Sequence, residues 1–200
     1  MGGAAKGLLT SPSGGTVLAA QRSALSLAGI PHVLVGEHPA YAREELEVLR
    51  DDPRAEGPLG GVLALLDRAQ GRYAIVLGCD MPFLDARTLH LLLDAPPAPA
   101  VAPRRGGRWE PFFARYEANV VLPIAIALAE DGGRSLQAML DRVESRELHL
   151  GEGRAQILDD WDTPEDVRAT LAAAAASTRA STSISSNTVG RRVTGRPTAP

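Results

Sequence analysis

Cysteine is almost absent from this chain of 200 residues, since Cys79 is the only one. A single cysteine cannot form an internal disulfide, and no Cys/His spacing typical of a zinc site accompanies it. The four histidines are scattered and give no ligand spacing. The composition therefore excludes disulfide-stapled and zinc-folded proteins.

The chain also lacks a long apolar run and an excess of one charge. No stretch approaches the roughly 18 apolar residues that would predict a membrane span. The formal net charge is −3, so no basic field attracts nucleic acid or an anionic membrane. The first residues, MGGAAKGLL, do not have the layout of a secretory signal. We therefore expect a cytoplasmic protein that binds neither nucleic acid nor membrane.

Strand-like and helix-like patterns alternate along most of the chain. Strands are expected at 32–36, 73–80, 100–105, 109–116 and within 154–163, and helices at 16–27, 44–50, 59–70, 86–95, 121–132, 135–143 and 163–176. This order predicts an α/β fold with a mostly parallel sheet and helices on both faces. The Ser/Thr/Arg/Gly/Pro-rich end predicts one domain over 1–176 and a disordered tail over 177–200.

One acidic side chain ends the most strand-like run of the chain. Residues 73–80 read YAIVLGCD, and Pro82 then stops the strand. In open α/β sheets ligands bind beyond the carboxyl ends of the strands, where an Asp is held rigidly and still reaches solvent. Asp80 is therefore a candidate ligand-binding residue. The alternative is that it only caps the turn or helix that follows.

Two glycine-containing segments are candidates for the same edge of the sheet. Gly2 and Gly3 allow close backbone approach and Lys6 supplies a compact positive charge, a combination that suits a phosphate, unless the segment is merely a flexible terminus. In EGPLGGVLALL, residues 56–66, Gly57 and Pro58 make a turn before a helix whose first turn could approach a ligand. The alternative is that this helix simply packs tightly on the sheet.

An acidic segment near the end of the domain is a third candidate. LDDWDTPED, residues 158–166, contains Asp160 and Asp162 on one side of an expected strand. One of them, Asp160 in particular, could join Asp80 in holding Mg²⁺, which prefers oxygen ligands. The alternative is that Asp162 and Thr163 only cap the following helix.

The chain resembles the molybdenum cofactor guanylyltransferases in five motifs, which occur in the order MGGxxKGLL, DxxxxGPLGG, LGCDMPFL, RWEPFFARY and DTPED. These enzymes belong to a nucleotidyltransferase superfamily with a Rossmann-like, three-layer α/β/α fold, and the resemblance runs from Met1 to about Leu171. It implies transfer of GMP from GTP to the terminal phosphate of molybdopterin, with Mg²⁺ and release of pyrophosphate. A molybdoenzyme or a cofactor-delivery protein would be a further partner.

The resemblance also implies a role for each matching residue. Lys6 would contact the triphosphate and stabilise charge on the leaving pyrophosphate, and Asp80 would bind Mg²⁺ with Asp160 beside it. Arg108 and Glu110 would face the pterin, and Asp52 would lie near the base or ribose. The implied nucleotide-binding set is Gly2, Gly3, Lys6, Asp52, Gly57, Pro58, Gly60 and Asp80.

The sequence departs from the family pattern at two places. The family opens with an apolar strand and a Leu-Ala-Gly-Gly-x-Ser-x-Arg stretch before the Met-Gly-Gly found here at residue 1. Either the chain starts at an internal Met or it is a truncated product, and we expect uncovered strand edges in the sheet. Asp160 and Asp162 stand where guanylyl-transferring proteins commonly have Asn. A CTP-dependent molybdopterin cytidylyltransferase, a sugar-phosphate nucleotidyltransferase and an inactive nucleotide-binding module therefore stay open.

Overall fold

The computed structural model describes residues 5–151, 154–159, 167, 168 and 172. The chain divides into two units, Met1–Trp161 and Asp162–Pro200. Val167, Arg168 and Ala172, the described part of the helix expected over 163–176, are helical. The expected boundary at 176/177 and the tail lie outside the described residues and stay predictions. Within the described ranges, no helix has both the length and the apolar character to cross a bilayer.

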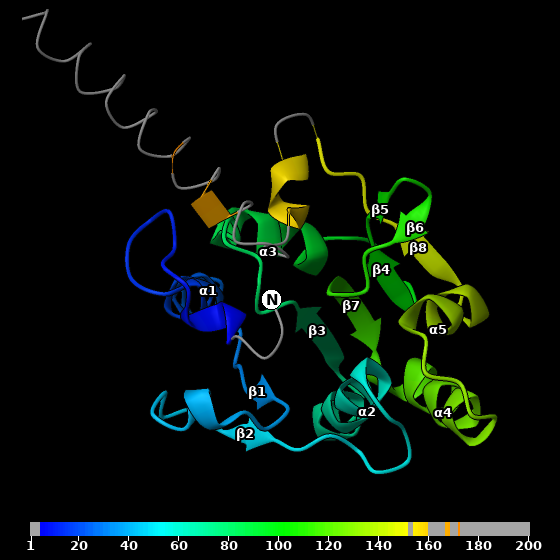
Figure 1. Ribbon diagram of the computed structural model, residues 1–200. Helices are drawn as coiled ribbons and strands as arrows, with labels where there is room; N and C mark the ends of the chain where they lie inside the picture. Colours follow the sequence, from blue (N-terminus) through cyan, green and yellow to red (C-terminus); the bar gives the residue numbers. More distant parts are fainter. Residues whose placement is uncertain (1–4, 152–153, 160–166, 169–171, 173–200) are drawn as a thin grey trace, which may run out of the picture. The chain divides into compact units, whose positions relative to one another are not determined.

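Helices and short strands alternate along the first unit (Figure 1). In chain order the elements are η1 (Lys6–Leu8), α1 (Val17–Leu27), β1 (Leu34–Val35), η2 (Pro39–Tyr41), β2 (Val48–Leu49), α2 (Pro58–Ala69), β3 (Tyr73–Leu77), α3 (Ala86–Leu93), β4 (Ala100–Ala102), β5 (Arg104–Arg105), β6 (Arg108–Trp109), β7 (Phe113–Glu117), α4 (Ala118–Glu130), α5 (Leu136–Arg142), β8 (Ser145–Glu147) and η3 (Ala155–Leu158).

Polar side chains fix the start of three helices. Thr16 caps α1, Asp85 caps α3 and Ser135 caps α5, each by accepting a hydrogen bond from the backbone N–H three residues later. Such caps satisfy one of the N–H groups that a helix cannot pair internally. Helix α2 instead begins at Pro58 after Gly57, whose φ of 66° is accessible to glycine at little cost.

The main sheet has four strands in the order β3-β7-β4-β8. β4 and β8 are parallel, as are β1 and β2 in a separate pair, whereas β7 is antiparallel to both β3 and β4. The reversal follows from the hairpin of β5 and β6, which turns the chain back through Gly106 and Gly107, both with positive φ. The parallel arrangement that the sequence predicts therefore holds for β1–β2 and β4–β8 but not for β7.

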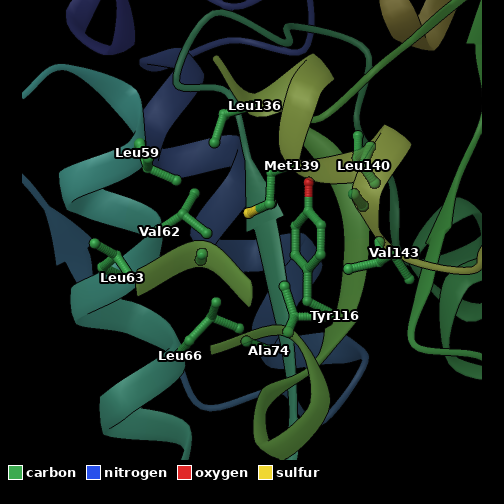
Figure 2. Packing of buried hydrophobic residues seen from close by; sticks show 14 of the residues in the cluster. Leu59, Val62, Leu63, Leu66, Ala74, Tyr116, Leu136, Met139, Leu140 and Val143 are labelled. Carbon is green, nitrogen blue, oxygen red and sulfur yellow. The ribbon is translucent and has the colours of Figure 1, made fainter. Parts of the chain in front are cut away.

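Apolar side chains cover both faces of this sheet, which gives the three layers that the sequence predicts. On one face Ala74 and Tyr116 pack with α2, α4 and α5, and Figure 2 shows Tyr116 among Leu66, Met139 and Val143. On the other face Val101 of β4 and Phe113 of β7 pack with α1, α3 and η3. The alternation of side chains along each strand separates the two clusters.

The structure corrects three local predictions. The helix predicted over 44–50 is wrong: Glu45 has a φ of 49°, and Val48 and Leu49 form β2 against β1. The strand predicted within 154–163 is wrong for its described part, because residues 155–158 form η3. β8 falls in a stretch with no predicted element, where three residues are held extended by parallel pairing to β4.

The sheet is interrupted between β1 and β3. These two strands are not hydrogen-bonded neighbours, and a groove of about 990 Å³ lies between them. The groove is lined by residues of α1, β1, α2 and β3.

Candidate active site

Lys6 and Asp80 meet at the carboxyl end of β3. Lys6 Nζ lies 2.9 Å from Asp80 Oδ2, and each side chain is 22% exposed. The two residues are 74 positions apart, so the contact depends on the fold. Lys6 is the only lysine of the chain, whose other basic residues are arginines. Asp80 lines the groove between β1 and β3, so this ion pair is a candidate contact for a charged ligand.

A buried side chain of α1 holds the loop that carries Asp80. Gln21, buried on α1, donates from Nε2 to the carbonyl oxygens of Gly78 at 2.7 Å and Met81 at 3.3 Å. Gly78 leaves room for the carboxylate, because a Cβ there would lie 2.8 Å from Asp80 Oδ1. The polypeptide between these two carbonyls is therefore clamped, with Asp80 inside the clamp.

Tyr41 holds the segment that carries Lys6 by a hydrogen bond. Its hydroxyl accepts a hydrogen bond from the N–H of Gly7 at 3.0 Å. Burial, and then the neighbouring Cys79, raise the pKa of Tyr41 above its ordinary value. Burial and the carboxylate of Asp80 likewise raise the pKa of Cys79. Cys79, which is exposed, thus stays a thiol at neutral pH.

The N-terminus of α2 opens onto the same groove as Asp80. Gly57 and Pro58 line the groove together with Asp80 and Asp51. Gly60 lies behind them, where a Cβ would be 2.6 Å from the carbonyl oxygen of Ala55. A helix N-terminus offers unpaired N–H groups and a partial positive charge, so this end of the groove favours a phosphate.

Asp52 is occupied by its own neighbour. Both of its carboxylate oxygens bond to the guanidinium of Arg54, at 2.9 and 2.7 Å, and one accepts a further bond from the N–H of that residue. The hydrogen bonds from Arg54 hold the pKa of Asp52 below its usual range. The adjacent Asp51, not Asp52, lines the groove.

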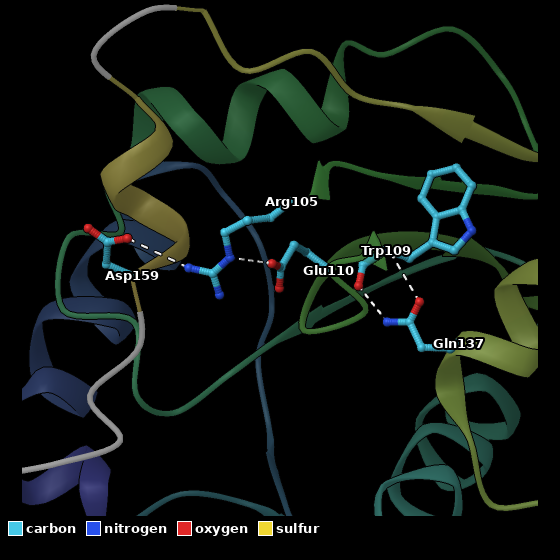
Figure 3. Close-up of polar contacts among 5 residues, drawn as sticks. All are labelled: Arg105, Trp109, Glu110, Gln137 and Asp159. Carbon is cyan, nitrogen blue, oxygen red and sulfur yellow. Dashed lines mark hydrogen bonds and ion pairs between the residues drawn. The ribbon is translucent and has the colours of Figure 1, made fainter. Parts of the chain in front are cut away.

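Arg108 and Glu110 belong to the β5–β6 hairpin region. Arg108 is exposed on β6. Figure 3 shows Glu110 accepting from Arg105 Nε at 2.7 Å, while Arg105 also reaches Asp159 at 3.6 Å. In the same view the Gln137 amide holds the backbone of Trp109. These contacts stiffen the hairpin, and neither Arg108 nor Glu110 lines the groove that contains Asp80.

Among the described residues, Asp80 is the carboxylate next to Lys6 that could contact a divalent cation. Among the described residues no group of three or more His, Cys, Asp or Glu side chains could hold a metal ion. Asp80 alone fits Mg²⁺ only in the mode in which phosphates of a bound nucleotide and water complete the shell. Asp160, Gly2 and Gly3 lie outside the described residues.

Sequence reasoning missed two residues that shape the site. Gln21 carried a signal, since it is a polar residue on the apolar stripe of α1, between Leu18 and Ala24. Tyr41 carried none, because it ends the three-residue η2 and its hydrogen bond crosses 34 positions.

Comparison with known proteins gives consistent relatives. A molybdenum cofactor guanylyltransferase of Pseudomonas putida is 35% identical over 111 residues, which cover 54% of this chain and 57% of that protein. One of Pseudomonas aeruginosa is 33% identical over 129 residues, covering 62% and 64%. The chain thus spans less than two thirds of the length of these curated relatives. Another Pseudomonas putida protein of that name is 30% identical over 169 residues, covering 82% and 87%.

Solved structures share the fold. Molybdopterin-guanine dinucleotide biosynthesis protein A from Archaeoglobus fulgidus superposes with a TM-score of 0.68 at 18% identity, covering 86% of this chain and 91% of that one. A 2-C-methyl-D-erythritol 4-phosphate cytidylyltransferase from Thermus thermophilus has a TM-score of 0.60 at 17% identity, covering 87% and 95%. The family model of the MobA-like NTP transferase domain matches residues 1–146. The chain therefore belongs to the MobA-like NTP transferase domain family.

Proposed function

We propose that this protein is a nucleotidyltransferase that transfers GMP from GTP to the terminal phosphate of molybdopterin. The observation that carries the proposal is the pairing of Lys6 with Asp80 at the carboxyl end of β3, where Asp80 lines a groove that the start of α2 also lines. The names of the relatives support guanylyl transfer as the chemistry. In this reaction a phosphate oxygen of molybdopterin attacks the α-phosphorus of GTP, the bond to the β-phosphate oxygen breaks, and pyrophosphate leaves.

The protein's own groups supply positioning and charge. Lys6 would place its ammonium against the triphosphate, and the N–H groups at the start of α2 would add a second positive end. Gln21 holds the loop that carries Asp80, and Tyr41 holds the segment that carries Lys6. Asp80, joined by Asp160, would hold Mg²⁺, which neutralises phosphate charge when bound. Asp51 lies closer to the groove than Asp52 and is the better candidate for a contact with the base or ribose.

The direct test is release of pyrophosphate by the purified protein with Mg²⁺ and one pair at a time of a nucleotide and an acceptor, either molybdopterin or a sugar phosphate. We expect turnover with GTP and none with CTP. Preference for CTP would replace guanylyl transfer by cytidylyl transfer, turnover of a sugar phosphate would favour a different acceptor, and no turnover with any pair would support an inactive binding module.

A binding test separates the site from the chemistry. Because Lys6 is the sole lysine, reductive methylation with ¹³C-formaldehyde labels one side chain and the terminal amine. Titration with GTP and Mg²⁺ should shift the Lys6 methyl signal saturably. Lys6→Met should abolish turnover, whereas Arg50→Met, which removes a positive charge from an exposed pair with Glu37, should leave turnover unchanged. An unmoved Lys6 signal at saturating GTP would remove this residue from the site.

A further inference from the structure

Helix α4 is apolar on its outer side as well as on its inner side. Residues 120–129, VVLPIAIALA, contain no charged or polar side chain. Val120, Pro123 and Ala127 are exposed, and we call these three residues the α4 stripe. A helix that is apolar all round is normally buried on all sides, so the α4 stripe is a surface that another molecule can cover. The opposite side of α4 faces the core through Ala118, Val121, Ala125 and Leu128.

The α4 stripe would lose little freedom on being covered. Alanine and proline have no rotamer entropy to lose on burial, and valine has little because its side chain is stiff. Ile124, beside the stripe, is already half-buried against the core cluster that α4 shares with α2 and α5 (Figure 1). Ordering side chains is one of the main costs of association, so this surface is well suited to a protein contact.

The two ends of α4 carry opposite charges. The carbonyl oxygen of Arg72 accepts a hydrogen bond from the N–H of Ala118, the first residue of the helix, at 3.0 Å. The side chain of Arg72 lies on the face of the sheet that α4 covers, because Ala74, two residues along the strand, packs in the same cluster as α4. Glu130 ends the helix. Both charged residues are exposed, and neither takes part in an ion pair among the described residues.

We propose that the α4 stripe is the contact between two copies of this chain, which pair through α4 in antiparallel orientation about a two-fold axis. This orientation places Arg72 of each copy next to Glu130 of the other, and it brings helix ends of opposite partial charge together. A parallel arrangement would bring like charges and like helix ends together. Asp131 does not change this balance, because Arg142 lies 3.2 Å from it and neutralises its charge.

The size of α4 sets the expected strength of the dimer. The helix has 13 residues and is therefore about 20 Å long. Ala127 and Pro123 are small enough to let two helix axes approach to about 8–10 Å. One helix face is smaller than the roughly 800 Å² per partner of a standard interface, so we expect a reversible dimer with a dissociation constant of roughly 10–100 µM.

Other partners fit this surface less well. A helix that lies on an anionic membrane carries lysine or arginine on its polar face, whereas α4 contains neither. An unrelated protein would have to supply both an apolar face and two charges in the right places. A second copy supplies all of these at once, because the surface is complementary to itself in the antiparallel orientation.

Sedimentation velocity of the 200-residue protein tests the proposal at concentrations between about 1 and 300 µM. We expect a shift from monomer to dimer over this range. Ala127→Glu places a charge at the closest approach of the two helices and should weaken association at least about tenfold. Leu27→Glu adds the same charge at a side chain on α1 that is 78% exposed, so it should leave association unchanged.

Charge reversal tests the antiparallel orientation. Arg72→Glu and Glu130→Arg should each weaken self-association at least about fivefold, because like charges then meet at both ends of the interface. An equimolar mixture of these two variants should associate about as tightly as the wild type, since each copy then offers the charge that the other lacks. If Ala127→Glu does not fold, this mixture decides alone. A monomer at every concentration, an Ala127→Glu variant that associates like the wild type, or a mixture no tighter than its components would overturn the proposal.

Discussion

Replacing Gln21 with leucine tests how the loop that carries Asp80 is held. Gln21 is 5% exposed and donates to the carbonyl oxygens of Gly78 at 2.7 Å and Met81 at 3.3 Å. Leucine keeps most of the volume and removes both bonds. A buried carbonyl left without a partner costs about 1–3 kcal/mol. Because the bond to Met81 is long, we expect a loss of about 2–3 kcal/mol in the free energy of unfolding.

Urea unfolding followed by circular dichroism measures this loss. With a slope of about 2 kcal/mol per molar urea, the midpoint should fall by about 1 M. Ser26→Ala, on the exposed face of the same helix, is the control and should stay within about 0.5 kcal/mol of the wild type. If the Gln21→Leu variant is as stable as this control, the inference that Gln21 holds the loop of Asp80 is wrong. The variant should also lose GTP-dependent turnover at urea-free conditions where it is fully folded, since Asp80 sits inside the released loop.

Three further changes test other contacts. The carboxylate of Asp85 caps α3 by accepting hydrogen bonds from the N–H and the hydroxyl of Thr88. Asp85→Ala removes this cap and should lower the free energy of unfolding by about 1 kcal/mol. Burial raises the pKa of Asp85, but the hydrogen bonds from Thr88 outweigh burial and lower this pKa below its ordinary value. The stabilisation by the cap is therefore present above about pH 4 and disappears as the pH falls through the pKa of the folded state. In thermal melts, the difference in stability between variant and wild type should be smaller at pH 3 than at pH 6. Gly60→Ala should destabilise by about 1–3 kcal/mol in urea titrations, because the new Cβ would lie 2.6 Å from the carbonyl of Ala55, whereas in an open helix this change gains about 1 kcal/mol. Arg115→Met should cost about 2–4 kcal/mol by the same titrations, because its guanidinium donates to four carbonyls at the end of α3.

Local patterns were sufficient for the longer elements. The helices expected at 16–27, 59–70 and 86–95 agree with α1, α2 and α3 within two residues at each end. Each has an apolar stripe and a start signal in its own sequence, a side-chain cap or the Gly57–Pro58 turn. Elements of this kind are specified within one window of residues, so a sequence reader has all the information that the chain uses.

Short strands could not be predicted in the same way. β2 has two residues and β8 has three, and neither is long enough to show an alternation. Each is extended because a distant strand offers a ladder, β1 in one case and β4 in the other. The orientation of β7 is likewise set by the hairpin before it and not by its own residues. Such features depend on pairing partners, which a single window of sequence does not contain.

The candidate site shows the same division at the level of single side chains. A motif states which residue types occur at which positions, and this was sufficient to single out Lys6 and Asp80, which meet across 74 positions. It could not state which carboxylates are already engaged by nearby cations. Asp52 is held by Arg54 only two positions away. Of these two adjacent acids, Asp52 is therefore engaged by a guanidinium, whereas Asp51, which is not part of the motif, lines the groove.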